Sequence, residues 1–311
     1  MMGVKGRAAL AIFFIVFFFC SLWLYGGLDR WDYCLKVYIQ EKESLTLHRN
    51  GTSEEDDMTP MEMCPGQKFQ VAVLLMHLQA APVSTNDVLL KPYLASWDEL
   101  IKFIDTLGPM VGLISQEIES KTSIIRELAK KEEAESKTQE SEGFAEDNQA
   151  SESSLPLPEL SPVSDATVGR AYTSVRSMIK AELDQGLVDF TQQTTSGCRT
   201  LLRLHRALLW LQLFLHSLAN EDLEAGRARS PAELCREAYR LTLAQHHLWW
   251  VRKAAELAFV AMPDRAFFYR LVCVETQAEA TAILSRVVRA IQKVYDRTQV
   301  ALEEHGMLEL P

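Results

Sequence analysis

Residues 197–218, GCRTLLRLHRALLWLQLFLHSL, constrain the fold more than any other stretch of this chain. At 100° per residue, Arg199, Arg203 and Arg206 fall within about 60° of one another on a helix. From Ala207 to Leu215 the sequence is apolar almost all the way round, and a helix of that kind is buried. Because arginines are rarely buried without a partner, we expect these guanidinium groups to face a cleft, a salt-bridge partner or an anionic ligand.

Negative charge is concentrated in two stretches of the chain. Residues 41–62 hold seven acids and two bases, and residues 131–162 hold nine acids and two bases, whereas the whole 311-residue chain has a net charge of −10. The remainder is therefore close to neutral. It lacks the basic surface that a nucleic-acid-binding protein requires, so we expect no nucleic-acid partner.

Residues 1–28 are predicted to target the chain to a membrane or anchor it there. Ala8–Tyr25 contains no charged residue, follows Lys5 and Arg7, and is just long enough to span a bilayer as a helix. Three interpretations stay open: an uncleaved signal anchor, a cleaved signal peptide and an unused hydrophobic tail. The first two place the protein at a membrane or in the secretory pathway, which the sequon at Asn50 favours, and the last places it in the cytosol.

The rest of the chain is predicted to be an acidic spacer followed by one helical domain. The spacer covers residues 29–64, and the domain covers residues 65–311 as an all-α fold of about eight helices, since no stretch alternates with period two. Residues 131–162 are rich in Glu, Ser and Pro and are predicted to form a disordered insertion. Helical patterns lie on both sides of it, so it interrupts a single domain.

Local signals predict where several helices begin and end. Ser96 is the predicted N-cap of one helix, and Gly108-Pro109 ends it. On the next helix Glu117 and Lys121 are four residues apart, which is typical of a solvated ion pair. Ser230-Pro231 predicts a later helix start, with the serine as cap and the proline in the first turn.

The six cysteines do not decide the redox compartment. Cys34 and Cys64 flank the acidic spacer and can bridge in an oxidising environment. Cys198, Cys235 and Cys273 lie in helical patterns, where we expect buried thiols.

No sequence motif of a familiar enzyme class is present. His246 and His247 are adjacent, so on a helix they point about 100° apart and do not chelate a metal together. Nothing supplies a nucleophile beside a base in a recognisable local pattern. We therefore expect no catalytic residue, no metal site and no cofactor.

The same residues suit a binding protein better. The three arginines with Lys121 can form a cationic pocket, because guanidinium groups match phosphate oxygens in pairs. Trp249-Trp250 beside Arg252-Lys253 has the character of a membrane-interface contact, and the apolar helix offers a lining for an alkyl chain. From the residues alone, two hypotheses stay open: a protein that binds an amphiphile, and a helical interaction module with a salt-bridged surface.

Longer blocks of sequence carry a family resemblance. The chain resembles the glycolipid transfer protein superfamily, and within it the members that carry ceramide-1-phosphate. The resemblance covers residues 69–311 apart from the acidic insertion. It implies a two-layer helical sandwich that holds one sphingolipid, with the head group at the surface and the chains between the layers. The matching blocks are LLKPYLASWDELIKFIDTLG, ISQEIESK, SGCRTLLRLHRALLWLQLFL, LAQHHLWWVRKAAELAFVAMP, IQKVYDRTQ and EHGMLELP.

The resemblance also implies roles for individual residues. Lys121, Arg199 and Arg203 match the positions that hold the lipid phosphate, with Arg206 as a supporting cation. His247 matches the histidine that anchors the ceramide amide together with an acidic residue, here Glu117. Trp249, with Trp250 next to it, matches the membrane-contacting aromatic edge.

Two substitutions carry the substrate argument. Where glycolipid-binding members have a tryptophan that stacks on the sugar, this chain has Arg203, and where they have an asparagine it has Lys121. Two cations suit a phosphate and disfavour a neutral sugar. Glu117 departs from the family, which normally has an aspartate there, so its carboxylate sits one methylene farther out.

The resemblance therefore implies a monomeric carrier that moves a phosphorylated sphingolipid of the ceramide-1-phosphate class between membrane surfaces. Three alternatives stay open. They are a membrane-tethered lipid sensor that does not shuttle, a glycosphingolipid carrier without phosphate selectivity, and a scaffold that binds no lipid.

Overall fold

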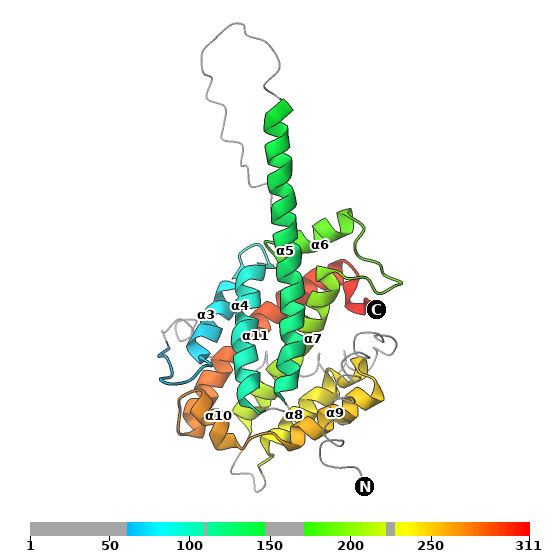
Figure 1. The fold of residues 1–311 in the computed structure, drawn as a ribbon. Coiled ribbons are helices and arrows are strands. Elements are labelled where there is room, and N and C mark those ends of the chain that lie inside the picture. Colours follow the sequence, from blue (N-terminus) through cyan, green and yellow to red (C-terminus); the bar gives the residue numbers. More distant parts are fainter. Residues whose placement is uncertain (1–60, 109–110, 147–170, 222–227) are drawn as a thin grey trace, which may run out of the picture.

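The computed structural model of the chain describes residues 61–108, 111–146, 171–221 and 228–311 (Figure 1). These residues form nine α-helices, two short 3-10 helices and one pair of two-residue antiparallel strands, which confirms the all-α class. None of the described helices is long and apolar enough to cross a bilayer. The predicted segment at residues 1–28 and residues 29–60 of the predicted spacer lie outside the described ranges.

The helices follow one another with short connections, apart from the break between α5 and α6. In chain order the elements are α3 (Val71–Ala80), β1 (Pro82–Val83), β2 (Asp87–Val88), α4 (Leu90–Thr106), α5 (Gly112–Glu146), α6 (Val175–Asp184), α7 (Gly197–Asn220), α8 (Pro231–Leu241), η3 (Ala244–His246), α9 (Trp249–Val260), α10 (Arg265–Leu271), α11 (Gln277–Glu304) and η4 (Met307–Glu309).

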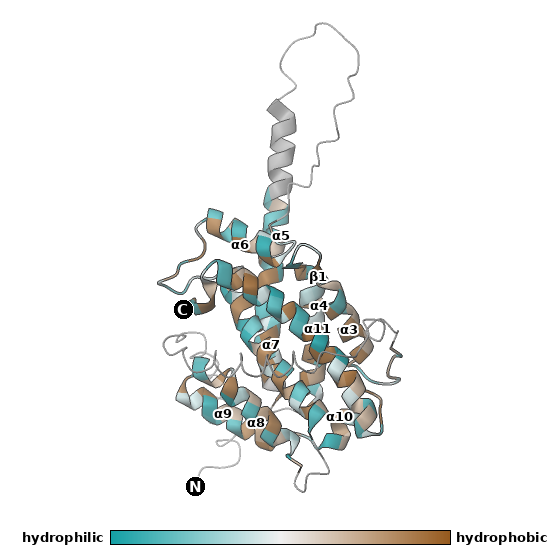
Figure 2. Ribbon diagram, turned by 180° about the vertical axis from the view of Figure 1, so that it is seen from behind, coloured by the Kyte–Doolittle hydropathy of each residue, from teal (hydrophilic) through white to brown (hydrophobic). Residues whose placement is uncertain are grey.

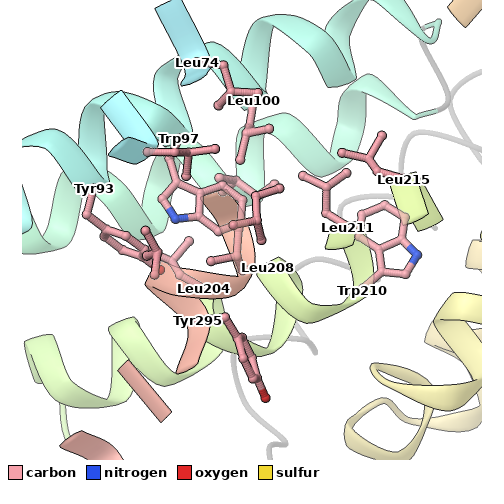
Figure 3. Packing of buried hydrophobic residues seen from close by; sticks show 14 of the residues in the cluster. Leu74, Tyr93, Trp97, Leu100, Leu204, Leu208, Trp210, Leu211, Leu215 and Tyr295 are labelled. Carbon is pink, nitrogen blue, oxygen red and sulfur yellow. The ribbon is translucent and has the colours of Figure 1, made fainter. Parts of the chain in front are cut away.

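The helices pack in two layers around α7. Helices α3, α4 and α5 lie side by side in one layer, and α7 lies beside α11 and α8 in the other. Helix α5 packs on α7 and α3 packs on α11, so the layers face each other. Side chains of α4, such as Trp97 and Leu100, meet those of α7, such as Leu204 and Leu208, in the apolar space between them (Figure 3). The apolar part of α7 is buried, as its sequence predicts.

The start of α7 is fixed by a buried carboxylate. Glu182, which is 1% exposed, accepts hydrogen bonds from the backbone N–H groups of Gly197 (2.5 Å) and Cys198 (2.9 Å). Its negative charge suits the positive end of the helix dipole. A Cβ atom at position 197 would lie 2.7 Å from the Met178 sulfur and 2.9 Å from the Glu182 carboxylate, so any larger residue would displace these side chains. This contact holds the first turn of α7 against α6.

Two predicted helix starts have different outcomes. The cap at Ser230 is confirmed, since its hydroxyl accepts from the Glu233 N–H and Pro231 occupies the first turn of α8. The cap at Ser96 is wrong. Helix α4 already begins at Leu90, and Ser96 is buried within it, donating to the Tyr93 carbonyl oxygen at 2.7 Å. Pro92 permits the earlier start, because a proline in the first turn has no helical N–H partner to lose.

The predicted disordered insertion at residues 131–162 is wrong for its first part. Helix α5 continues to Glu146 and projects beyond the rest of the domain (Figure 1). A helix that is already nucleated extends at little cost through Lys, Glu and Ala residues. Lys131 and Glu135, whose charged groups lie 3.8 Å apart, add an ion pair along its exposed side. Residues 147–162 lie outside the described ranges.

Two cysteine expectations are wrong, because Cys64 pairs with Cys273 and not with Cys34. Cys273 is not a buried thiol: it forms a disulfide with Cys64, 209 residues earlier, across a Cα–Cα distance of 5.8 Å. The helical pattern ends at Leu271, so Cys273 lies in the turn after α10, with φ at 58° and its side chain toward the surface. Cys198 and Cys235 are buried free thiols as predicted, and Cys34 lies outside the described residues.

Removing this disulfide is expected to destabilise the domain. Cross-links of this kind contribute about 2–4 kcal/mol, because they restrict the unfolded chain. For a domain of this size each kcal/mol corresponds to about 2–4 °C, so the paired replacement Cys64→Ser and Cys273→Ser is expected to lower the melting temperature by about 10 °C. Reducing agent should produce the same decrease in the unmodified protein and none in the variant. Equal melting temperatures in all four samples would contradict the expectation.

Candidate functional site

The three arginines of α7 lie beside a polar pair on α5. Helix α5 packs along α7, and this contact brings Glu117 and Lys121 to the arginine-bearing side of α7. Glu117 acts electrostatically on Arg203, and Arg203 acts on both Arg199 and Arg206. The sequence-predicted head-group residues therefore form one cluster, which we call the cationic cluster: Lys121, Arg199, Arg203 and Arg206, with Glu117.

Lys121 is buried, contrary to the expectation of a solvated ion pair. Its side chain is 5% exposed, and its ammonium group lies 2.9 Å from the Glu117 carboxylate, whose side chain is 37% exposed. The predicted pairing is right, but the lysine of the pair is buried and not in bulk water. Here Glu117 neutralises the lysine and keeps part of its own surface open to solvent.

Arg203 is the member of the cluster whose guanidinium makes no hydrogen bond with the described residues. Its side chain is half-buried, and within the described ranges it makes no hydrogen bond or ion pair. Burial lowers the pKa of its guanidinium, and the nearby Glu117 carboxylate only partly opposes that shift. A guanidinium group that has left water without gaining hydrogen bonds is unfavourable, so this position favours an anionic ligand.

Arg199 is already fully engaged by the protein. Its Nε donates to the Pro311 backbone oxygen at 2.7 Å. One terminal nitrogen donates to the Thr194 carbonyl and hydroxyl oxygens, and the other donates to the carbonyl oxygens of Asp189 and Gln192. All five N–H groups are therefore in use. The side chain is 5% exposed and ties the loop before α7 to the C-terminal segment.

Arg206 joins the cluster to the histidines and to the C-terminal segment. One terminal nitrogen donates to the Leu308 carbonyl oxygen at 2.7 Å, whereas the buried Nε has no hydrogen-bond partner among the described residues. Burial, with a contribution from Arg203, lowers the pKa of Arg206 to about 10. Its charge also acts on both His246 and His247.

His247 lies next to the cluster, held by a tyrosine. The Nδ1 atom of His247 is 2.8 Å from the Tyr239 hydroxyl, and the side chain is half-buried. Burial, followed by the charges of Arg206 and Arg252, lowers the pKa of His247 to about 4. The imidazole is therefore neutral at physiological pH. His246 ends η3, whereas His247 has extended backbone, so the two rings do not share a helix.

The tryptophan pair is split by the structure. Trp249 begins α9 and is 69% exposed, whereas Trp250 is half-buried. Two further large apolar side chains of α9, Leu257 and Val260, are 65% and 74% exposed. Helix α9 lies against α8 at one end of the molecule, and both helices carry apolar as well as polar residues (Figure 2). Only Trp249 of the pair extends into solvent.

An apolar cavity lies between the two layers. Its volume is about 20 Å³, which is room for little more than a water molecule. It is lined from both layers, by Phe69, Val71, Leu74, Leu100, Phe103, Leu215, Val272, Leu284 and Val287. Any chain longer than a few methylenes requires the layers to separate at this point.

Sequence reasoning missed three hydrogen-bonding groups of the site, namely the Tyr239 hydroxyl and two backbone oxygens. Tyr239 lies eight residues before His247. Because a turn separates the two residues, helical periodicity does not predict that their side chains meet. The backbone oxygens of Leu308 and Pro311 accept from two arginines, and backbone acceptors carry no sequence signal.

No group of three or more metal-ligating side chains is arranged to hold a metal within the part of the chain that the structure describes.

Comparisons with known proteins agree on one family. A family model for glycolipid transfer protein matches residues 88–155 and 158–274. The ceramide-1-phosphate transfer protein of Xenopus laevis is 36% identical over 251 residues, which is 79% of this chain and 98% of that protein. The human ceramide-1-phosphate transfer protein is 32% identical over 246 residues, covering 78% and 97%.

Solved structures agree with these relatives. The crystal structure of mouse ceramide-1-phosphate transfer protein in its apo-form superposes with a TM-score of 0.61 at 34% identity, covering 78% of this chain and all of that one. The human protein in complex with 2:0 ceramide-1-phosphate gives a TM-score of 0.61 at 31% identity, covering 78% and 98%.

Proposed function

The chain belongs to the glycolipid transfer protein family, and we propose that it binds one sphingolipid with a phosphate head group and transfers it between membranes. The observation that carries this proposal is Arg203, a half-buried cation that makes no hydrogen bond or ion pair with the described residues and lies among other cations. The relatives that match nearly their whole length to this chain are ceramide-1-phosphate transfer proteins, so ceramide-1-phosphate is the proposed ligand.

The phosphate is proposed to bind between α5 and α7. Arg203 supplies the main bidentate contact, and Lys121 and the free Nε of Arg206 contribute further donors. Arg199 has no donor to spare, so its proposed part is electrostatic, together with holding the neighbouring loop in place. A neutral sugar would leave these charges unpaired, and that penalty is the source of the proposed selectivity.

The ceramide amide is proposed to lie between Glu117 and His247. A carboxylate accepts from the amide N–H, and a neutral imidazole donates to the amide oxygen. Glu117 is 37% exposed and is held by Lys121, so it has a free side toward the ligand. Glu117 is one methylene longer than the aspartate that the family resemblance implies, and its ion pair with Lys121 holds the carboxylate in place.

The lipid chains are proposed to enter the apolar cavity between the layers. Each buried methylene contributes about 0.8 kcal/mol, so a pair of chains supplies the affinity without a cofactor. The cavity is nearly closed in this structure, so entry requires the helices around it to separate. No covalent bond is made or broken in this step, so the proposed activity is a physical transfer and not a reaction.

Membrane docking is proposed to use the exposed face of α9. Replacing Trp249 with alanine is expected to weaken binding to phosphatidylcholine vesicles by about tenfold, since moving a large apolar side chain from water into the interface contributes about 1.5–3 kcal/mol. Vesicle sedimentation measures the effect. Met76→Ala, which removes another exposed apolar side chain from α3, is the matched control and should bind normally. Equal losses in both variants would contradict a specific docking face.

A membrane-tethered sensor and a glycosphingolipid carrier are the competing functions. A sensor binds ceramide-1-phosphate without releasing it to acceptor vesicles, whereas an unselective carrier moves galactosylceramide as well.

Titrating the protein with ceramide-1-phosphate and then with ceramide, which lacks the phosphate, tests the proposed head-group site. We expect affinity for ceramide-1-phosphate to exceed that for ceramide at least tenfold. Equal affinities for the two lipids would show that the cationic cluster does not bind the phosphate.

We propose that the domain faces an oxidising compartment and is monomeric there. The Cys64–Cys273 disulfide supports this placement, because such bonds persist in secreted and lumenal proteins. The hydrophobic segment Ala8–Tyr25 and the sequon at Asn50 agree with it. Treating the cellular protein with a glycosidase should increase its gel mobility, and Asn50→Gln should abolish that shift. Free thiols at both Cys64 and Cys273 in protein taken from cells would contradict the placement.

A further inference from the structure

The hydroxyl of Tyr239 has a single hydrogen-bond partner in the described part of the chain. Its side chain is 4% exposed, and the hydroxyl lies 2.8 Å from Nδ1 of His247. The ring is held by Phe259, whose centroid is 5.4 Å away in a T-shaped arrangement. Tyr239 is therefore fixed in place, and its hydroxyl meets the imidazole at one particular nitrogen.

We infer that Tyr239 is a positioning residue that sets the tautomer of His247, so that the ring presents Nε2–H to the amide oxygen of a bound sphingolipid. This inference rests on the proposed function, in which His247 donates to that oxygen. Tyr239 itself does not contact the lipid. It determines which ring nitrogen of His247 carries the proton.

The hydrogen-bond count favours this tautomer. His247 is neutral, so it has one N–H, and Tyr239 keeps its proton because burial raises the pKa of the hydroxyl. If Nδ1–H donated to the phenol oxygen, the tyrosine proton would be left buried without an acceptor. If the hydroxyl donates to Nδ1, both groups are satisfied and the histidine proton lies on Nε2.

The opposite tautomer would work against the ligand. It would direct the Nε2 lone pair at a carbonyl oxygen, and two acceptors repel. With the proton on Nε2, the pair of His247 and Glu117 offers one donor and one acceptor, which match the carbonyl and the N–H of an amide. The hydroxyl of Tyr239 therefore contributes selectivity for lipids with an amide linkage, at a distance from the lipid itself.

The test uses Tyr239→Phe in the full chain, which keeps the ring and its packing and removes only the hydroxyl. In nitrogen-15 NMR of histidine-labelled, lipid-free protein at neutral pH, the unmodified chain is expected to show His247 as the Nε2–H form. The variant is expected to show a mixture of tautomers. Tyr93→Phe, which removes another buried hydroxyl from α4, is the matched control and should leave the His247 signal unchanged.

Lipid binding gives the second measurement. Tyr239→Phe is expected to weaken ceramide-1-phosphate about tenfold and to leave a dialkyl-ether phosphatidic acid, which has no carbonyl, unaffected. In a His247→Gln background, whose side-chain amide donates without a tautomer, the tyrosine change should have no further effect. An unchanged His247 spectrum in Tyr239→Phe, or equal losses for both lipids, would overturn the inference. If the unmodified chain binds neither lipid, the proposed function fails, and the spectrum alone still decides the role of Tyr239.

Discussion

Replacing Arg203 with leucine is expected to lower the rate of ceramide-1-phosphate transfer between vesicles by about 100-fold or more. A charge-assisted hydrogen bond contributes about 1.5–3 kcal/mol, and a bidentate contact makes two of them. A loss of about 3 kcal/mol corresponds to more than 100-fold in affinity. The protein itself should stay folded, because Arg203 makes no hydrogen bond or ion pair within the described ranges that the substitution would break.

The matched control for this variant is Arg126→Leu. Arg126 lies on α5, five residues beyond Lys121, and pairs with Asp98 at 2.7 Å outside the cationic cluster. The Arg126→Leu substitution makes the same change of charge and volume as Arg203→Leu. Because surface ion pairs contribute little, its transfer rate should stay within about twofold of the unmodified protein's rate. Transfer by Arg203→Leu at the control rate would show that the phosphate binds elsewhere.

Narrowing the interlayer cavity is expected to have a comparably large effect. Val287→Phe places a ring on α11 where the cavity of about 20 Å³ now lies, and it should reduce transfer of long-chain ceramide-1-phosphate by about 100-fold. Excluding four methylenes from the cavity costs about 3 kcal/mol at about 0.8 kcal/mol each. Fluorescent-lipid transfer between vesicles measures the loss, and thermal unfolding checks that the variant is folded.

Val300→Phe provides the comparison for this substitution. Val300 is on the same helix but is 36% exposed, so the added ring reaches solvent instead of the space between the layers. Its transfer rate should match that of the unmodified protein. If Val287→Phe also transfers at the normal rate while remaining folded, the lipid chains do not occupy this cavity.

Short-range patterns predicted the elements well where one local interaction decides the structure. The arginines at positions 199, 203 and 206 do share one side of α7, because helix geometry alone places them there. Glu117 and Lys121 do pair, and Ser230 does cap its helix, for the same reason. Each of these relations spans eight residues or fewer.

Features that depend on the folded chain were not predictable. The five acceptors of Arg199 come from a loop and from Pro311, which only the fold brings together. The partner of Cys64 lies 209 residues away, and a nearer cysteine was as plausible from spacing. The composition of residues 131–146 alone favours disorder. That composition also suits an exposed helix once α5 has started.

The most direct test of the account is lipid choice in a transfer assay. Fluorescent ceramide-1-phosphate and galactosylceramide are offered in separate donor vesicles, and their arrival in acceptor vesicles is followed with the unmodified protein and with Arg203→Leu. We expect transfer of the phosphate lipid alone, and loss of that transfer in the variant. Transfer of galactosylceramide at a similar rate, or undiminished transfer by Arg203→Leu, would contradict it.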